Sequence, residues 1–237
     1  MAYKKNISDK LALGYGSKYQ LLRMLGWHRN EFNKAVSEVA SISSNINWLD
    51  FEFNGPEDKE LLNFDFISQL KDEWRNYWKC GAAGLNWDAV GITDDGVYVL
   101  VEAKAHVKEL ESSSGGSNKS KESNNKVIDN YLKSNGIKRT AEDWNNKCYQ
   151  LANRLIALDF LEKHGVKAKL VYVLFENGFE FNSSSNKSAT SHEWEKAFDE
   201  ELILAGVKNT EIEKKINVCI FNCNKKIKKF RQFKRYI

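Results

Sequence analysis

The sequence predicts a mixed α/β fold in which helices flank one central sheet. Two apolar runs lie on either side of "TDDG" at 93–96, where Asp-Gly is a hairpin signal, so we expect strands at 87–92 and 97–106. A nearly continuous apolar segment at 166–175 is typical of a strand that is covered on both faces. Helical segments with one apolar face come before and after these strands.

Two helical segments are expected before the hairpin. At 16–43, Ser17 can cap a helix whose apolar face begins with Leu21 and Leu22, and this segment runs as one helix or breaks near Gly26. The second, at 57–79, follows the only proline and is rich in Trp and Phe.

Two more helices are expected in the second half of the chain. Thr140 and Asp143 resemble a capping box, which predicts a helix that ends at Gly165. Thr190 starts another helix that runs to about Leu204.

Polar segments separate these elements. Residues 111–126 are rich in Ser, Gly, Asn and Lys and are predicted to form a flexible loop, either a passive linker or a mobile lid. Residues 182–191 are predicted to be a second polar loop, and 216–222 a further strand.

Length and composition fit one domain over 1–237, with a core at about 17–175 and a C-terminal part, at 190–237, of helix, strand and basic extension. With 29% charged residues and no long apolar run, we expect neither a membrane protein nor a disordered chain. The first residues lack a signal-peptide core, which favours a cytoplasmic protein. None of the four cysteines forms a CxxC pair, so we expect reduced thiols.

Basic residues concentrate in the last 14 residues, which hold seven Lys or Arg and no acid, although the whole chain has a net charge of only +4. Such a segment is either a solvated charged end or a surface for the phosphates of nucleic acid. Ile227, Phe230, Phe233 and Tyr236 have helical spacing, which favours a docked amphipathic segment. The candidates for phosphate contact are Lys228, Lys229, Arg231, Lys234 and Arg235.

Charged residues close the second strand of the hairpin. Because side chains alternate along a strand, Glu102 and Lys104 share one face, and His106 shares it too. His106 either touches a site there or lies on the surface at the strand end. Asp88, on the partner strand, is expected near the same end of the sheet.

A buried carboxylate must be compensated, either by a plain Glu–Lys ion pair or by a metal ion. Two carboxylates with a backbone oxygen suit Mg²⁺. The pattern ExK occurs three times, but only Glu102–Lys104 ends a strong strand with an acid one strand earlier. The context of the triplet therefore indicates a metal site.

"NWD" at 86–88 and "VEAK" at 101–104 resemble the motif of the PD-(D/E)xK nuclease superfamily, which has a restriction-endonuclease-like αβββαβ core. Trp87 stands where that family has proline. The resemblance implies that Asp88, Glu102 and the Ala103 carbonyl bind Mg²⁺ or Mn²⁺, and that Lys104 positions or activates the attacking water. "YQLLR", "NWDAVG", "LVEAKAH" and "YQLANRL" also resemble a group of uncharacterised bacterial proteins.

Other residues are candidates for auxiliary roles. A helix acid often completes sites of this superfamily, which suggests Glu38 or Glu31, and Gln20 is another polar group on the first helix. Some exonuclease-like members use a Gln on the helix after the motif. Gln150 fits that place, with Arg154 one turn on, unless the helix turns Gln150 toward solvent.

The function expected from these residues is metal-dependent hydrolysis of DNA or RNA phosphodiesters. The alternative is a catalytically inactive protein of the same fold that binds nucleic acid or a protein partner. The sequence leaves open whether the chain forms a homo-oligomer. Aromatic residues in the predicted helices are more typical of a core than of a base-stacking surface.

Overall fold

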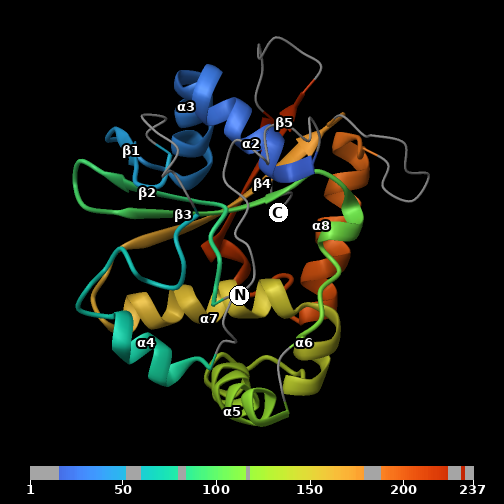
Figure 1. The fold of residues 1–237 in the computed structure, drawn as a ribbon. Helices are drawn as coiled ribbons and strands as arrows, with labels where there is room; N and C mark the ends of the chain where they lie inside the picture. Colours follow the sequence, from blue (N-terminus) through green and yellow to red (C-terminus); the bar gives the residue numbers. More distant parts are fainter. Residues whose placement is uncertain are drawn as a thin grey trace.

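The computed structural model describes residues 16–51, 60–79, 84–115, 118–178, 188–223 and 231–232. These residues form a mixed α/β structure around one sheet (Figure 1). Among them, no helix is both long and apolar enough to span a membrane.

The sheet has the strand order β1-β2-β3-β4-β5-β6. The neighbours β1 and β2, β2 and β3, and β5 and β6 are antiparallel, whereas β4 is parallel to β3 and to β5. The described strands are β1 (Ile46–Trp48), β2 (Ala89–Thr93), β3 (Tyr98–Lys104), β4 (Ala168–Glu176), β5 (Ile216–Asn222) and β6 (Arg231–Gln232).

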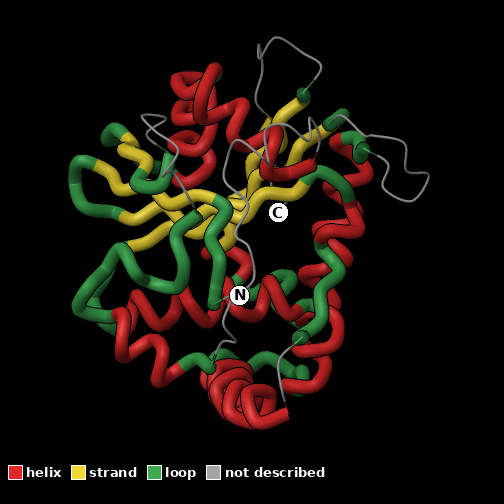
Figure 2. The backbone as a smooth tube through the Cα atoms, viewed as in Figure 1, coloured by secondary structure: helices red, strands yellow, loops and turns green. Residues whose placement is uncertain are grey.

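Helices cover both faces of the sheet (Figures 1 and 2). One face packs against α2 (Gly16–Trp27) and α3 (Arg29–Ala40). The other packs against α7 (Tyr149–Lys163), with further helices around it. These are α4 (Lys71–Tyr77), α5 (Asn118–Ser134), α6 (Ala141–Lys147) and α8 (Ser191–Ala205).

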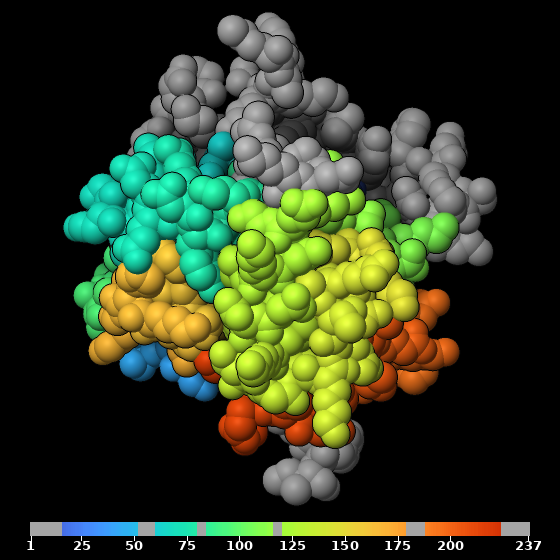
Figure 3. Space-filling model, turned by 90° about the horizontal axis from the view of Figure 1, so that it is seen from below, coloured from blue at the N-terminus to red at the C-terminus, as the bar shows by residue number. Residues whose placement is uncertain are grey.

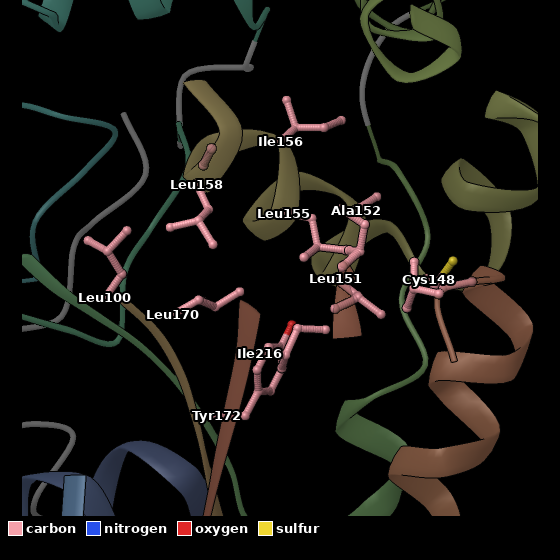
Figure 4. Packing of buried hydrophobic residues seen from close by; sticks show 14 of the residues in the cluster. Leu100, Cys148, Leu151, Ala152, Leu155, Ile156, Leu158, Leu170, Tyr172 and Ile216 are labelled. Carbon is pink, nitrogen blue, oxygen red and sulfur yellow. The ribbon is translucent and has the colours of Figure 1, made fainter. Parts of the chain in front are cut away.

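Strand β3 divides its side chains between the two faces. Val99, Val101 and Ala103 are buried against α2 and α3, while Leu100 is buried in the core beneath α7. Leucines of α7 face Leu170 and other buried side chains of the sheet (Figure 4). The alternation therefore directs Glu102 and Lys104 to the α7 side.

Helix α7 begins at a break in the long helix that the sequence predicts over 140–165. Cys148 has φ −137° and ψ 39°, which are not helical angles, and separates α6 from α7. Ser112 supplies hydrogen-bond acceptors for the first N–H groups of α7, which have none within the helix. Its carbonyl accepts from Tyr149 N (3.2 Å) and its hydroxyl from Gln150 N (2.8 Å). This serine therefore caps α7 from a distant segment.

Most predicted elements are confirmed. The hairpin, the strands at 166–175 and 216–222, and the helix break at Trp27 and His28 are all present, with boundaries that differ by a few residues. The predicted capping box forms at Thr140, and the helix that starts at Thr190 also has one. The described cysteines, at 148, 219 and 223, are buried free thiols.

The prediction of a flexible loop at 111–126 is wrong for its second half, because helix α5 begins at Asn118. Asn124 fixes this helix to the end of α4: its side chain accepts from Lys79 N and donates to Lys79 O, both at 2.9 Å. Ile128 and Leu132 of the same helix are buried. Figure 3 shows α4 (teal) beside α5 (light green) on the outer surface.

Two other predictions need correction. Of the helix expected at 57–79, only α4 forms; residues 63–70 make turns, and part of the segment lies outside the described residues. The short strand β1 was not predicted.

The basic C-terminal segment is largely outside the described residues, as are Lys228, Lys229, Lys234 and Arg235. Arg231 and Gln232 form strand β6, whereas Ile227, Phe230, Phe233 and Tyr236, whose spacing predicts a docked amphipathic segment, lie outside the described residues. Phosphate contact by this segment remains a prediction.

Gly91 provides a test of the packing between β1 and β2. A Cβ atom there would lie 2.7 Å from Ile46 Cγ2 and 3.2 Å from Trp48 Cε3. We expect Gly91→Ala to lower the free energy of unfolding by about 1–3 kcal/mol, the usual cost of overpacking. Chemical denaturation measures this. Gly115→Ala is the control, since a Cβ atom there meets nothing within 4 Å; equal stability of the two variants would contradict the packing.

Candidate active site

The C-terminal end of β3, the residues before β2 and the first turns of α7 surround a cavity of about 730 Å³. The motif residues predicted from the sequence meet here. The cavity is lined by Asp88, Glu102, Ala103, Lys104, Gln150 and Arg154, among other residues.

Glu102 is the most deeply buried acid of this cavity, with 1% of its surface exposed. Its Oε2 accepts from Arg154 Nε at 2.7 Å and forms an ion pair with Arg154 Nη2 at 2.5 Å, while its Oε1 accepts from Lys104 Nζ. Burial alone would raise the pKa of Glu102, but Arg154 and Lys104 hold it below its ordinary value. Glu102 is therefore ionised at neutral pH.

Arg154 is fixed by several contacts besides Glu102. Its Nη2 donates to the Asn86 carbonyl (2.7 Å), and its Nη1 donates to Asn153 Oδ1 (2.9 Å). Its guanidinium lies 4.7 Å from the centre of the Trp87 ring. A planar group with this many partners has little rotational freedom.

Gln150 lies one turn before Arg154, on the same face of α7. Its Oε1 accepts from Lys104 Nζ at 2.9 Å. The Lys104 ammonium thus donates to Glu102 and Gln150, and one of its three N–H groups remains for another acceptor.

Asp88 lies beside the end of β3. Its Oδ2 accepts from Ala103 N (2.8 Å), and Lys18 Nζ lies 3.4 Å from its Oδ1 and 2.7 Å from its carbonyl oxygen. Burial raises the pKa of Asp88, Lys18 lowers it, and the nearby Glu102 carboxylate raises it further, with a net upward shift. Repulsion between two carboxylates is what a bound cation relieves.

The sequence did not identify Lys18 and Glu60. Lys18 Nζ also contacts Glu60 Oε1 at 2.7 Å, so it bridges Asp88 and Glu60. Asp50 is close enough for the charges of Lys18 and Glu60 to act on it, and its carboxylate accepts from Val90 N. Burial raises the pKa of Asp50 to about 7. These contacts join residues that are far apart in the chain, so no local sequence pattern predicts them.

Three helix residues predicted for auxiliary roles do not line the cavity. Glu31 and Glu38 are exposed on α3, which covers the opposite face of the sheet. Gln20 is buried, and its Oε1 accepts from Arg23 Nη1 at 3.2 Å.

His106 was expected on the face of β3 that carries Glu102. It lies beyond the strand, immediately before the short 3₁₀ helix η1 (Val107–Glu109). Its Nε2 is 3.1 Å from Glu109 Oε1, and it is not among the residues that line the cavity.

The oxygen atoms at this cavity are of the type that could hold a hard divalent cation. Oε1 of Glu102 faces the Lys104 ammonium group, and Oδ1 of Asp88 faces the Lys18 ammonium group. Because a carboxylate oxygen has two lone pairs, each of these oxygens can still bind a metal ion. The Ala103 carbonyl adds a backbone oxygen. No group of three or more His, Cys, Asp or Glu suited to a metal occurs within the described ranges, but Mg²⁺ often takes one or two carboxylates and keeps several waters.

Comparison with known proteins gives no match. Neither a family model, nor a curated protein, nor a solved structure matches the chain.

The ion pair of Glu102 and Arg154 can be tested by stability. Arg154→Met leaves Glu102 with Lys104 alone, and we expect the free energy of unfolding to fall by about 3–5 kcal/mol at neutral pH. A carboxyl group whose pKa is lower in the folded protein than in the unfolded chain stabilises the fold at pH values above the unfolded-state pKa. This stabilisation is lost as the pH falls through the folded-state pKa. The difference from wild type should therefore shrink below about pH 4.5, the ordinary pKa of Glu.

Denaturation at several pH values measures both effects. Arg75→Met is the matched control, because Arg75 pairs with Asp65 at the surface and should cost at most about 1 kcal/mol. Glu102→Gln combined with Arg154→Met should recover part of the loss. A destabilisation that does not depend on pH would contradict the ionised state of Glu102.

Proposed function

We propose that this protein is a divalent-metal-dependent hydrolase of nucleic-acid phosphodiesters, with Asp88, Glu102 and the Ala103 carbonyl as metal ligands. The observation that carries the proposal is that the buried Glu102 and the carboxylate of Asp88 line one cavity, next to Lys104. Hard oxygen ligands beside a lysine are the parts that metal-assisted attack on a phosphodiester needs.

The order of the elements supports a restriction-endonuclease-like core. Helix α3, strands β1, β2 and β3, helix α7 and strand β4 occur in the order αβββαβ, with α4 inserted between β1 and β2 and with η1, α5 and α6 inserted between β3 and α7. Glu102 and Lys104 end β3, as the resemblance to the PD-(D/E)xK superfamily implies, whereas Asp88 lies immediately before β2 instead of on that strand.

Each residue has a distinct role in this proposal. A bound Mg²⁺ or Mn²⁺ would polarise the phosphate and lower the pKa of a bound water. Lys104 would direct its remaining N–H to that water or to a phosphate oxygen and offset the charge that develops there. Gln150 and Arg154 are positioning residues, since they hold the Lys104 ammonium and the Glu102 carboxylate in place.

The ion-pair network favours one alternative. Because Lys104 and Arg154 compensate Glu102 without a metal, the same residues would also suit an inactive protein that keeps the fold and binds nucleic acid or a partner. Metal binding separates the two functions.

Asp88→Asn tests the metal site directly. The amide keeps an oxygen for Ala103 N but removes a charged ligand, so we expect affinity for Mn²⁺ to fall by more than about tenfold. Calorimetric titration measures binding, and cleavage of single- and double-stranded DNA and RNA measures activity. Asp94→Asn, in the turn at the other end of the same hairpin, is the control and should match wild type. No binding by wild type at millimolar Mn²⁺, with no cleavage, would leave the inactive alternative.

Lys18 provides a second test. Its ammonium faces the carboxylate and the carbonyl of Asp88, so it opposes a cation bound there. Lys18→Met keeps most of the aliphatic stem, and we expect Mn²⁺ affinity to rise by about tenfold, which is about 1.4 kcal/mol. Lys71→Met removes a more exposed lysine near Asp65 and should change nothing. Weaker binding by Lys18→Met would mean that Lys18 positions Asp88 for the metal instead.

A further inference from the structure

We infer that the cavity takes single-stranded nucleic acid, with one or two nucleotides inside it, and excludes a continuous duplex. This inference rests on the proposed function and adds the class of substrate. Three observations support it: the motif residues are deeply buried, the cavity wall has few free positive charges, and an aromatic pair lies beside the motif.

The motif residues are recessed. Glu102 and Lys104 are 1% and 4% exposed, so a phosphate must enter the cavity to reach them. A cavity of about 730 Å³ has the size of a site for a small molecule, which is typically about 300–1,000 Å³. It therefore has room for a nucleotide or two but not for both strands of a rigid duplex.

Another part of the cavity wall comes from the segment between β3 and α5 and from the first half of α5. Glu109, Glu111, residues 112–115, Ser120 and Asn124 line it, and Trp78 and Lys79 close the side near α4. Apart from the two acids and Lys79, these side chains are uncharged. The serine and asparagine side chains offer hydrogen-bond donors and acceptors to bases and sugars.

The charge of the lining does not suit a run of phosphates. Among the lining residues that the structure describes, the cations are Lys79, Lys104 and Arg154, and the last two already contact Glu102. The acids among them are Asp88, Glu102, Glu109 and Glu111. A duplex presents about one negative charge per 1.7 Å of its axis, which such a wall cannot neutralise. One phosphate next to a bound cation is compatible with it.

An aromatic pair lies beside the motif. Tyr149 packs on Trp78 with ring centres 6.3 Å apart and an angle of 27° between the rings. Trp78 is almost fully buried, whereas Tyr149 is half-buried at the start of α7 and lines the cavity. Unstacked bases of a single strand bind to such rings, while the bases of an intact duplex are already stacked.

The test compares end-labelled DNA oligonucleotides of one sequence, as a single strand, a blunt duplex and a duplex with a single-stranded tail. Fluorescence anisotropy gives affinity, and gel analysis with millimolar Mg²⁺ gives products. We expect the single strand to bind at least about tenfold more tightly than the blunt duplex. Cleavage should be confined to single-stranded regions.

Variants of Tyr149 test the stacking surface. Tyr149→Leu keeps apolar packing on Trp78 but removes the ring, and should weaken single-strand binding about 5- to 150-fold, the range that follows from about 1–3 kcal/mol per stacked base. Tyr149→Phe should bind like wild type. Trp27→Ala is the control, because Trp27 is 83% exposed and does not line the cavity. Thermal unfolding verifies that each variant is folded.

The outcomes separate this inference from the proposed function. Internal cleavage of the blunt duplex, or equal affinity for it, overturns the inference and leaves a nuclease. Selective binding of the single strand without any cleavage supports the inference and removes the proposed activity. Binding by Tyr149→Leu that equals wild type, or no binding of the single strand, also overturns the inference.

Discussion

The ionised carboxylate of Glu102 is the constraint on which the site depends. It lies inside the structure, where an unpaired charge would cost several kcal/mol, and it is tolerated because a lysine and an arginine meet its two oxygens. Lys104 comes from the same strand and Arg154 from the helix that crosses it. The ion pair between Arg154 and the charged Glu102 therefore helps to hold α7 in place on the sheet.

The two faces of the sheet contribute different cations. Arg154 reaches Glu102 from α7, and its contacts with the Asn86 carbonyl and the Trp87 ring also join that helix to the residues before β2. Lys18 reaches Asp88 from α2, which covers the other face. Helices on opposite sides of the sheet therefore each hold one of the two carboxylates, Glu102 from the α7 side and Asp88 from the α2 side.

The hairpin and its charges could be predicted from the sequence because they depend on local rules. Alternation placed Glu102 and Lys104 on one face, and the Asp-Gly turn brought Asp88 beside them. Gln150 came from the family resemblance, with Arg154 one turn on, and both line the cavity. The metal, the substrate and the restriction-endonuclease-like core remain proposals.

What could not be predicted depends on contacts between distant residues. Lys18 and Asp88 are 70 positions apart, and nothing near either residue indicates the other. Helix α5 has a polar first half, yet it forms where Asn124 bonds to the Lys79 backbone and the second half buries its apolar face. The break at Cys148 likewise requires Ser112, which lies before α5.

Anomalous diffraction from crystals grown with Mn²⁺ tests the central claim most directly. The metal assignment predicts a peak within bonding distance of the Asp88 carboxylate, the Glu102 carboxylate and the Ala103 carbonyl oxygen, with Lys18 moved away from Asp88. A cavity without a peak at millimolar Mn²⁺, with Glu102 still held between Lys104 and Arg154, would contradict it and identify these residues as a structural ion-pair network.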